Sequence, residues 1–311
     1  MVFGHFRGRS PLRRVWNRSD VEPESLREYD AFGPWLLQVK SAAEMPRRFR
    51  SAYAGLSDAD YLIKIPRSID RRDAYPGADL YGEVFALDAD GFTLLEAVDD
   101  AEGFVSRQVT WDDVAAVRVV SNLLHADFAL LLKEGDALTV TYNSVSADLM
   151  TRVIAFVRQH CVEPDDFASS STNDAEEFED FFFNAMLAEE RHGGQFMLPV
   201  HFEAPGKACR NAQNRRRVTT GLLILLSASE LVVIDRDTPM RRRFFAHYIY
   251  RKTYLNLNSV RAFRLQPPPD SVPGHFMMLE LILEQQRLGI PCFKTPDRVI
   301  ELLRRRGIVR L

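Results

Sequence analysis

Gly82-Glu-Val-Phe-Ala-Leu-Asp-Ala-Asp-Gly-Phe-Thr-Leu-Leu-Glu96 predicts a strand, a tight turn at Asp88-Ala-Asp-Gly91 and a second strand. The later stretch Gly221-Leu-Leu-Ile-Leu-Leu-Ser-Ala-Ser-Glu-Leu-Val-Val-Ile-Asp235 has the same layout. Two hairpins of one design, far apart in a chain of 311 residues, indicate an internal repeat.

The segments that follow each hairpin also match. Alternating residues 105–119 contain Trp111-Asp-Asp-Val114, and residues 250–265 contain Leu257-Asn-Ser-Val260 at the same place. A second hairpin comes next, at 128–142 and at 276–293, and then an amphipathic helix that Ser146 or Thr295 is expected to cap. Pro296 is expected at the first position of the second helix.

The match extends upstream of each hairpin. A predicted helix at 46–53 leads to a strand at 61–65, and a predicted helix at 177–191 leads to a strand at 196–202. Each repeat is therefore predicted as a helix, a strand, a basic loop, several antiparallel strands and a final helix. This order predicts an α+β fold that is mainly β.

Composition sets the boundaries of the two modules. Residues 1–28 form an arginine-rich arm that we expect to be flexible, and residues 29–162 form the first module. Residues 163–178 are acidic, include Ser169-Ser-Ser-Thr172 and contain no lysine or arginine, which is typical of a linker. Residues 179–311 form the second module.

The net charge of −3 conceals a strong asymmetry. Residues 191–311 carry 21 basic and 9 acidic residues, whereas residues 1–190 carry 19 basic and 34 acidic residues. Such a division indicates either an anionic partner for the C-terminal part or docking of one half on the other.

This layout resembles the pleckstrin-homology (PH)/GRAM superfold, including its bacterial PH-like branch, over about residues 60–160 and 195–307. The resemblance implies two tandem PH-like modules, each a partly open antiparallel barrel closed by its C-terminal amphipathic helix, with an extra helix before each module. A strand, hairpin and helix pattern is also compatible with an α+β sandwich, in which the helix covers a flat sheet.

The resemblance also implies a place for an anion. In PH domains that bind phosphoinositides, the loop after the first strand carries a lysine and then a basic-x-Arg string. The second module is similar there, and a further arginine run precedes Phe244-Phe245. The predicted anion ligands are Lys207, Arg210, Arg215, Arg216, Arg217, Arg241, Arg242 and Arg243. The alternative is that these are solvated basic loops.

The corresponding loop of the first module is a poorer match. Lys64, Arg67, Arg71 and Arg72 are basic there, but Asp70 and Asp73 dilute their charge.

These patterns favour a non-enzymatic binding or adaptor protein whose basic second module engages an anionic surface, either phospholipid headgroups or an acidic protein. Nucleic acid is a less favoured partner. No catalytic, metal or cofactor motif is found, and His160-Cys161 lacks a partner that would orient it. The alternative is a regulatory protein–protein module in which the acidic linker masks the basic face.

The same patterns bear on location. No segment is long and apolar enough to span a bilayer. The expected location is the cytoplasm or, peripherally, the inner face of the membrane.

Overall fold

The computed structural model describes residues 17–98, 103–162, 178–192, 197–205, 208–210, 216–218, 220–236, 249–267 and 277–311, with the backbone alone at 208–210 and 216–218. The chain forms two compact units, and the boundary between them in the sequence falls between Gln108 and Val109. The expected linker at 163–178 lies almost entirely outside the described residues, as does the arm up to residue 16.

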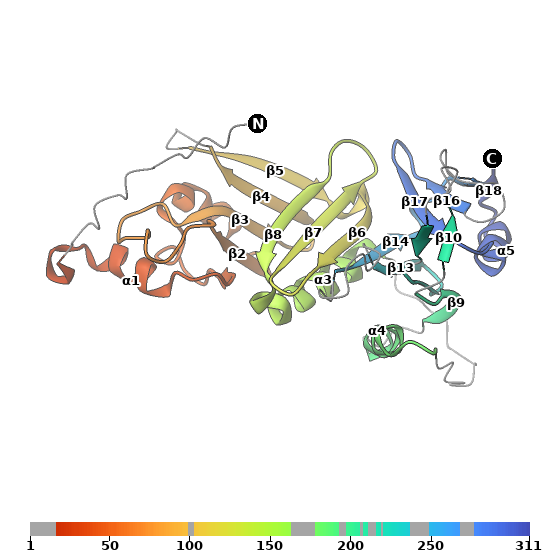
Figure 1. The fold of residues 1–311 in the computed structure, drawn as a ribbon. Helices are drawn as coiled ribbons and strands as arrows, with labels where there is room; N and C mark the ends of the chain where they lie inside the picture. The colour runs from red at the N-terminus through yellow and green to blue at the C-terminus, as the bar shows by residue number, and fades with distance from the viewer. Residues whose placement is uncertain are drawn as a thin grey trace, which may run out of the picture. The chain divides into compact units, whose positions relative to one another are not determined.

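The first unit contains one antiparallel sheet with helical segments beside it (Figure 1). Its core gathers apolar residues around Phe49 and around Tyr81. The predicted helix at 46–53 is found as a 3-10 turn followed by a short α-helix. In chain order the elements are η1 (Arg18–Asp20), α1 (Pro23–Ala31), β1 (Leu37–Gln38), η2 (Arg47–Ala52), α2 (Tyr53–Leu56), β2 (Tyr61–Pro66), β3 (Tyr81–Leu87), β4 (Gly91–Ala97) and β5 (Phe104–Thr110).

The second unit begins with a turn, a sheet and two helices. Their bounds are η3 (Trp111–Asp113), β6 (Val114–Ser121), β7 (His125–Leu132), β8 (Leu138–Asn143), η4 (Ser144–Ser146), α3 (Ala147–Cys161) and α4 (Phe181–His192). The remaining elements are β9 (Leu198–Glu203), β10 (Ala208–Arg210), β11 (Arg216–Val218), β12 (Leu222–Leu226), β13 (Glu230–Arg236), β14 (Tyr250–Asn256), η5 (Leu257–Ser259), β15 (Ala262–Gln266), β16 (Met277–Ile282), β17 (Arg287–Cys292), α5 (Asp297–Arg305) and β18 (Val309–Arg310).

The described elements repeat in order, and the structure is mainly β with antiparallel sheets. Strands β2 to β5 lead through η3 to β6, β7, β8 and α3, whereas β9 and β12 to β14 lead through η5 to β15, β16, β17 and α5. The turns η3 and η5 end alike, because Val114 and Val260 donate their backbone N–H to Trp111 and Leu257. None of the sheets formed by the described residues closes into a barrel.

The helix caps differ from the prediction. Ser146 holds the N-cap position of α3, but its side chain makes no capping hydrogen bond there. Asn143 instead accepts from the Val145 N–H, at 3.0 Å, and caps the preceding turn η4. Helix α5 has Pro296 rather than Thr295 at its N-cap position. The chain therefore enters α3 through the 3-10 turn η4, and the side-chain capping hydrogen bond is made at the start of that turn instead of at the start of α3.

One strand pair joins the two repeats within the second unit. In the described part of the unit, a seven-stranded sheet has the order β8-β7-β6-β14-β13-β12-β9, so β6 of the first repeat is bonded to β14 of the second (Figure 1). This pairing places β6, β7, β8 and α3 in one compact unit with residues 178–311. The compact unit therefore begins at residue 109, whereas composition suggests that the second module begins at residue 179.

Side chains alternate across this sheet and give it two different faces. Strand β14 directs Thr253 and Leu255 to one face, which we call the core face, and Lys252 and Tyr254 to the other, which we call the helix face. The core face packs on the sheet β17-β16-β15-β18, and Leu255, Phe263 and Leu279 share its hydrophobic core.

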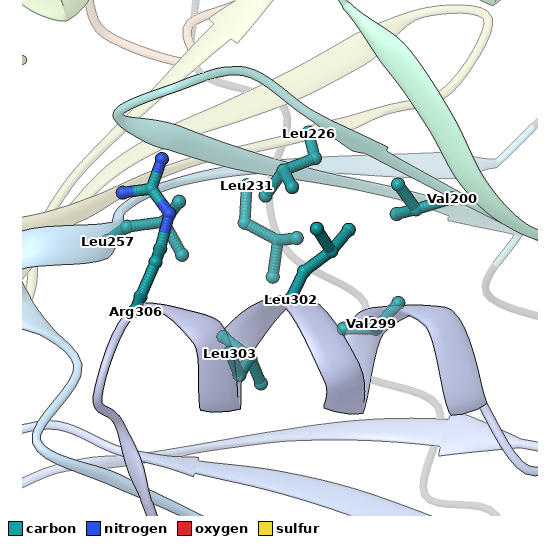
Figure 2. Close-up of a pocket in the computed structure, with 8 residues that line it drawn as sticks. All are labelled: Val200, Leu226, Leu231, Leu257, Val299, Leu302, Leu303 and Arg306. Atoms are coloured by element: carbon teal, nitrogen blue, oxygen red, sulfur yellow. The ribbon is translucent and has the colours of Figure 1, made fainter.

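Helix α5 covers one end of this core. Figure 2 shows Leu302 of α5 directed toward Leu226 and Leu231 of the strands above, and Val299 and Leu303 of the same helix belong to this core. No water-sized space remains between them. The apolar side of the helix is therefore fully used in packing, as the amphipathic pattern predicts.

The helix face carries a network of buried charges. Arg158 of α3 bonds Glu230 of β13 through two nitrogens, at 3.1 and 2.6 Å, and reaches Glu190 of α4 at 3.1 Å. Glu190 also accepts from Lys252 at 3.0 Å and from the Tyr254 hydroxyl at 2.9 Å. The guanidinium carbon of Arg158 lies 4.1 Å from the centre of the Tyr254 ring. Both helices are thereby fixed to the same strands.

The protonation of the network follows from burial and pairing. Burial raises the pKa of Glu230, and the Arg158 guanidinium opposes that rise. Burial lowers the pKa of Lys252, but the carboxylates of Glu190 and Glu189 outweigh it and hold the pKa above its ordinary value. Each charge depends on its partner, because an uncompensated buried charge is costly.

Arg158→Ala is expected to lower the free energy of unfolding by about 3–5 kcal/mol, because Glu230 and Glu190 would stay buried without their cation. The matched control is Arg305→Ala, whose exposed pair with Glu301 spans one turn of α5. It is expected to cost at most about 0.5 kcal/mol. Urea unfolding of both variants checks this, and equal losses would contradict the structural role of the network.

Gly221→Ala is expected to destabilise the second unit more than Gly135→Ala. Both glycines have positive φ, 94° and 79°, so both substitutions carry backbone strain of about 1–2 kcal/mol. A Cβ at Gly221 would also lie 2.6 Å from a ring carbon of Phe183, whereas Gly135 faces open space. Thermal unfolding of the two variants measures the difference, and a Gly221→Ala variant as stable as Gly135→Ala would exclude the close packing of α4 on this turn.

Candidate anion-binding site

The basic loops that the sequence predicts as anion ligands are only partly described. Lys207, Arg215 and Arg241 to Arg243 lie outside the described residues. Arg210, Arg216 and Arg217 lie on β10 and β11, whose backbone pairs antiparallel with Arg210 opposite Arg216 and Cys209 opposite Arg217. The backbone therefore brings Arg210 and Arg216 to the same position of one small hairpin.

The structure places a further group of arginines at the polar end of the core face. Arg118 of β6 lies directly opposite Thr253 of β14, and Arg251 lies two residues away on the same strand. Residues two apart on a strand share a face, so Arg118 and Arg251 are diagonal neighbours. On the other side of β14, Asp235 of β13 lies opposite Arg251.

Arg251 and Asp235 form a two-pronged ion pair. The Nε and Nη2 atoms of Arg251 donate to the two carboxylate oxygens of Asp235, at 3.1 and 2.9 Å. The side chain of Asp235 is 9 % exposed and that of Arg251 is 30 % exposed. This pair fixes the guanidinium of Arg251 in orientation.

Arg118 has no carboxylate within ion-pair distance among the described residues. Its Nε donates a long hydrogen bond, 3.4 Å, to the hydroxyl of Thr253. Burial lowers the pKa of Arg118, and the positive charge of Arg251 lowers it further against the opposing effect of Asp235. The guanidinium stays charged at any physiological pH, because the ordinary pKa of arginine is far above that range. Two like charges are therefore held close together at a half-buried position.

Strand β17 forms the opposite wall and completes a cleft of about 240 Å³. We call it the arginine cleft; its lining residues are Arg118, Val233, Asp235, Arg251, Thr253, Arg287, Leu288, Gly289 and Ile290. Arg287 is 64 % exposed and lies 3.9 Å from Glu280, a distance typical of a weak surface pair. Three guanidinium groups and one carboxylate face this space. Its excess positive charge and its fork-shaped donors suit a phosphate or carboxylate.

Sequence reasoning missed these three arginines. Arg118 stands in the otherwise apolar run Val114-Ala-Ala-Val-Arg-Val-Val120, where a charge at a half-buried position is an unusual signal. Arg251 and Arg287 occur in ordinary strand patterns with no comparable signal. Only the pairing of β6 with β14 brings Arg118 next to Arg251, and that pairing links residues more than a hundred positions apart.

Other chemistry has less support in the described residues. No group of three or more histidine, cysteine or acidic residues is placed there to hold a metal ion. Burial raises the pKa of the Cys161 thiol to about 12, so Cys161 is protonated at neutral pH and is a poor nucleophile beside His160. No described helix is long and apolar enough to cross a membrane.

Comparison with known proteins gives no family to draw on. A scan against protein-family models finds no match, and a search of curated proteins finds no significant one. Function is therefore argued from the geometry of the arginine cleft and of the repeated fold.

Proposed function

We propose that this chain is a non-catalytic binding protein whose C-terminal half engages an anionic surface, with the arginine cleft receiving one phosphate of a phospholipid headgroup. The supporting observation is the position of Arg118, half-buried beside Arg251 and without an ion pair to any carboxylate of the described residues. In the free protein, the two cations repel each other. A bound anion would remove that repulsion, and this gain would add to the favourable free energy of anion binding.

The repeated order of elements supports a tandem PH-like scaffold for this function. Apart from the small hairpin of β10 and β11 in the second repeat, each repeat has four strands, a 3-10 turn, three strands and a helix in sequence within the described residues. PH-like modules serve mainly as binding platforms, so this order favours an adaptor over an enzyme. The proposed location is the cytoplasm and the inner face of the membrane.

Vesicle co-sedimentation tests the proposal on the full chain. Wild type is expected to bind vesicles that contain phosphatidylserine and to release at high salt, because phosphate contacts are screened. Arg118→Gln is expected to weaken binding about tenfold or more, because a charge-assisted hydrogen-bond donor is lost. The matched control is Arg305→Gln, an exposed arginine of the same unit.

Two further arms locate the site and its ligand. Arg215→Ala/Arg216→Ala/Arg217→Ala removes three of the arginines that the sequence predicts as anion ligands. If this variant loses vesicle binding and Arg118→Gln does not, the site lies in the predicted loop and not in the cleft. Inositol hexakisphosphate is expected to compete with the vesicles. Equal binding to phosphatidylserine and phosphatidylcholine vesicles at low salt would refute the lipid ligand and favour an acidic protein.

A second candidate function, regulation by the acidic linker, has one observation in its favour. Asp180, two residues after the linker, lies 3.5 Å from Arg236 of β13 and accepts from the Phe182 N–H at 2.9 Å at the start of α4. The acidic linker therefore joins the second module beside an arginine of β13.

Neutralising the linker tests this regulation without shortening the chain. Replacing the acidic residues of 163–177 with their amides is expected to strengthen binding to phosphatidylserine vesicles, because a competing intramolecular anion is removed. The control replaces Asp112 and Glu134, two acidic residues outside the linker, in the same way. Unchanged vesicle affinity in the linker variant would contradict masking.

A further inference from the structure

The first unit contains a cavity of about 410 Å³ that takes no part in the function proposed above. Its walls come from α1, β1, the loop that follows β1, the turn η2 and β2. The volume falls within the range of about 300–1,000 Å³ that is usual for small-molecule sites. The lining residues are Glu24, Arg27, Glu28, Ala31, Leu37, Gln38, Ser41, Ala43, Glu44, Met45, Arg50 and Lys64.

Lys64 supplies a buried amine to the cavity. The residue is 6 % exposed and lies on β2 opposite Leu37 of β1. Its Nζ donates to the carbonyl oxygen of Glu44 at 2.8 Å and lies 4.6 Å from the centre of the Tyr81 ring. An ammonium group has three donors, and these contacts leave capacity for an anionic acceptor. Burial lowers the pKa of Lys64, so such an acceptor would stabilise the charged form.

Glu28 supplies the opposite charge from α1. Burial raises the pKa of its carboxyl group, although Lys64 and Arg47 lower it. Within the described part of the chain Glu28 accepts no hydrogen bond and makes no ion pair, with Lys64 or with any other cation. A cation placed beside Glu28 would therefore stabilise the carboxylate in the way that an anion would stabilise Lys64.

Arg50 adds a guanidinium to the lining of the same cavity. One of its terminal nitrogens pairs with Glu24. A guanidinium has five N–H donors, so Arg50 can donate to a ligand carboxylate while it keeps this pair. Between the charged groups, Ala31, Leu37 and Met45 provide an apolar wall.

We propose that this cavity binds a small zwitterion with an apolar side chain, of the α-amino acid class. The ligand's ammonium group would pair with Glu28, its carboxylate would accept from Lys64 and Arg50, and its side chain would lie against Leu37 and Met45. A simple anion would leave Glu28 without a cation, and a simple cation would leave Lys64 without an anion. A zwitterion satisfies both ends in one molecule.

Calorimetric titration of the full chain with L-leucine, L-isoleucine, L-valine and L-methionine tests the proposal. At least one of these amino acids is expected to bind. For leucine, the analogues 3-methylbutylamine and 4-methylpentanoate each lack one charged group, and each is expected to bind about tenfold more weakly or worse. Failure of the whole panel, or an analogue that binds as tightly as its amino acid, would overturn the zwitterion site.

Variants tie the binding to the cavity. Glu28→Gln keeps the shape of the side chain and is expected to weaken binding about tenfold or more, as is Lys64→Met. Arg72→Gln is the control, because Arg72 is 81 % exposed and does not line the cavity. Undiminished binding by Glu28→Gln, or an equal loss in Arg72→Gln, would overturn the assignment even if Lys64→Met fails to fold. Vesicle binding, which depends on the second unit, is expected to be unchanged in Glu28→Gln.

Discussion

Residues 116–121 of β6 pair with residues 250–255 of β14 in a single antiparallel register, and both faces of the seven-stranded sheet depend on it. The register places Arg118 on the core face beside Thr253 and leaves Tyr254 on the helix face beneath Arg158. A slip of one residue would turn every side chain of a strand to the opposite face. Arg118 would then meet the cations of the helix face. The apolar residues of β6 and the buried charges of β14 together select the observed register.

The two faces treat charge in opposite ways, and the contrast distinguishes a structural role from a binding role. On the helix face, each buried charge has a partner of opposite sign: Arg158 has Glu230 and Glu190, and Lys252 has Glu190 and Glu189. At the arginine cleft, Asp235 pairs with Arg251, whereas Arg118 makes a long hydrogen bond to a hydroxyl and no ion pair with any residue that the structure describes. Removing one partner from the balanced network would leave a buried charge uncompensated, which is costly. The cations of the cleft outnumber its carboxylate, so an anion there would reduce their repulsion.

The local parts of the fold could be predicted from the sequence, because they rest on patterns of a few residues. The hairpin of β3 and β4 is found where the Asp88 turn predicts it, and the Asp88 carboxylate accepts from the Asp90 and Gly91 N–H groups, at 2.8 and 3.0 Å. The burial of Trp111 follows in the same way from its place at a bend between strands. The pairing of β6 with β14 could not be predicted in this way, since backbone hydrogen bonds carry no sequence code and either strand could equally well have formed an edge. The arginine cleft depends on that pairing and was missed for the same reason.

The charge asymmetry of the chain allows two explanations, docking between halves or an anionic partner, and the described ion pairs bear on the first. Acidic residues from before position 191 do meet basic residues from after it, as in the pairs of Lys252 with Glu189 and Glu190 and of Arg236 with Asp180. These contacts use only a few of the 21 basic residues after position 190. Arg158 reverses the pattern, because it brings a cation from the acidic half to Glu230 of the basic half. Contacts between the halves therefore account for the buried charges at the helix face, whereas the arginines of the cleft outnumber its one carboxylate.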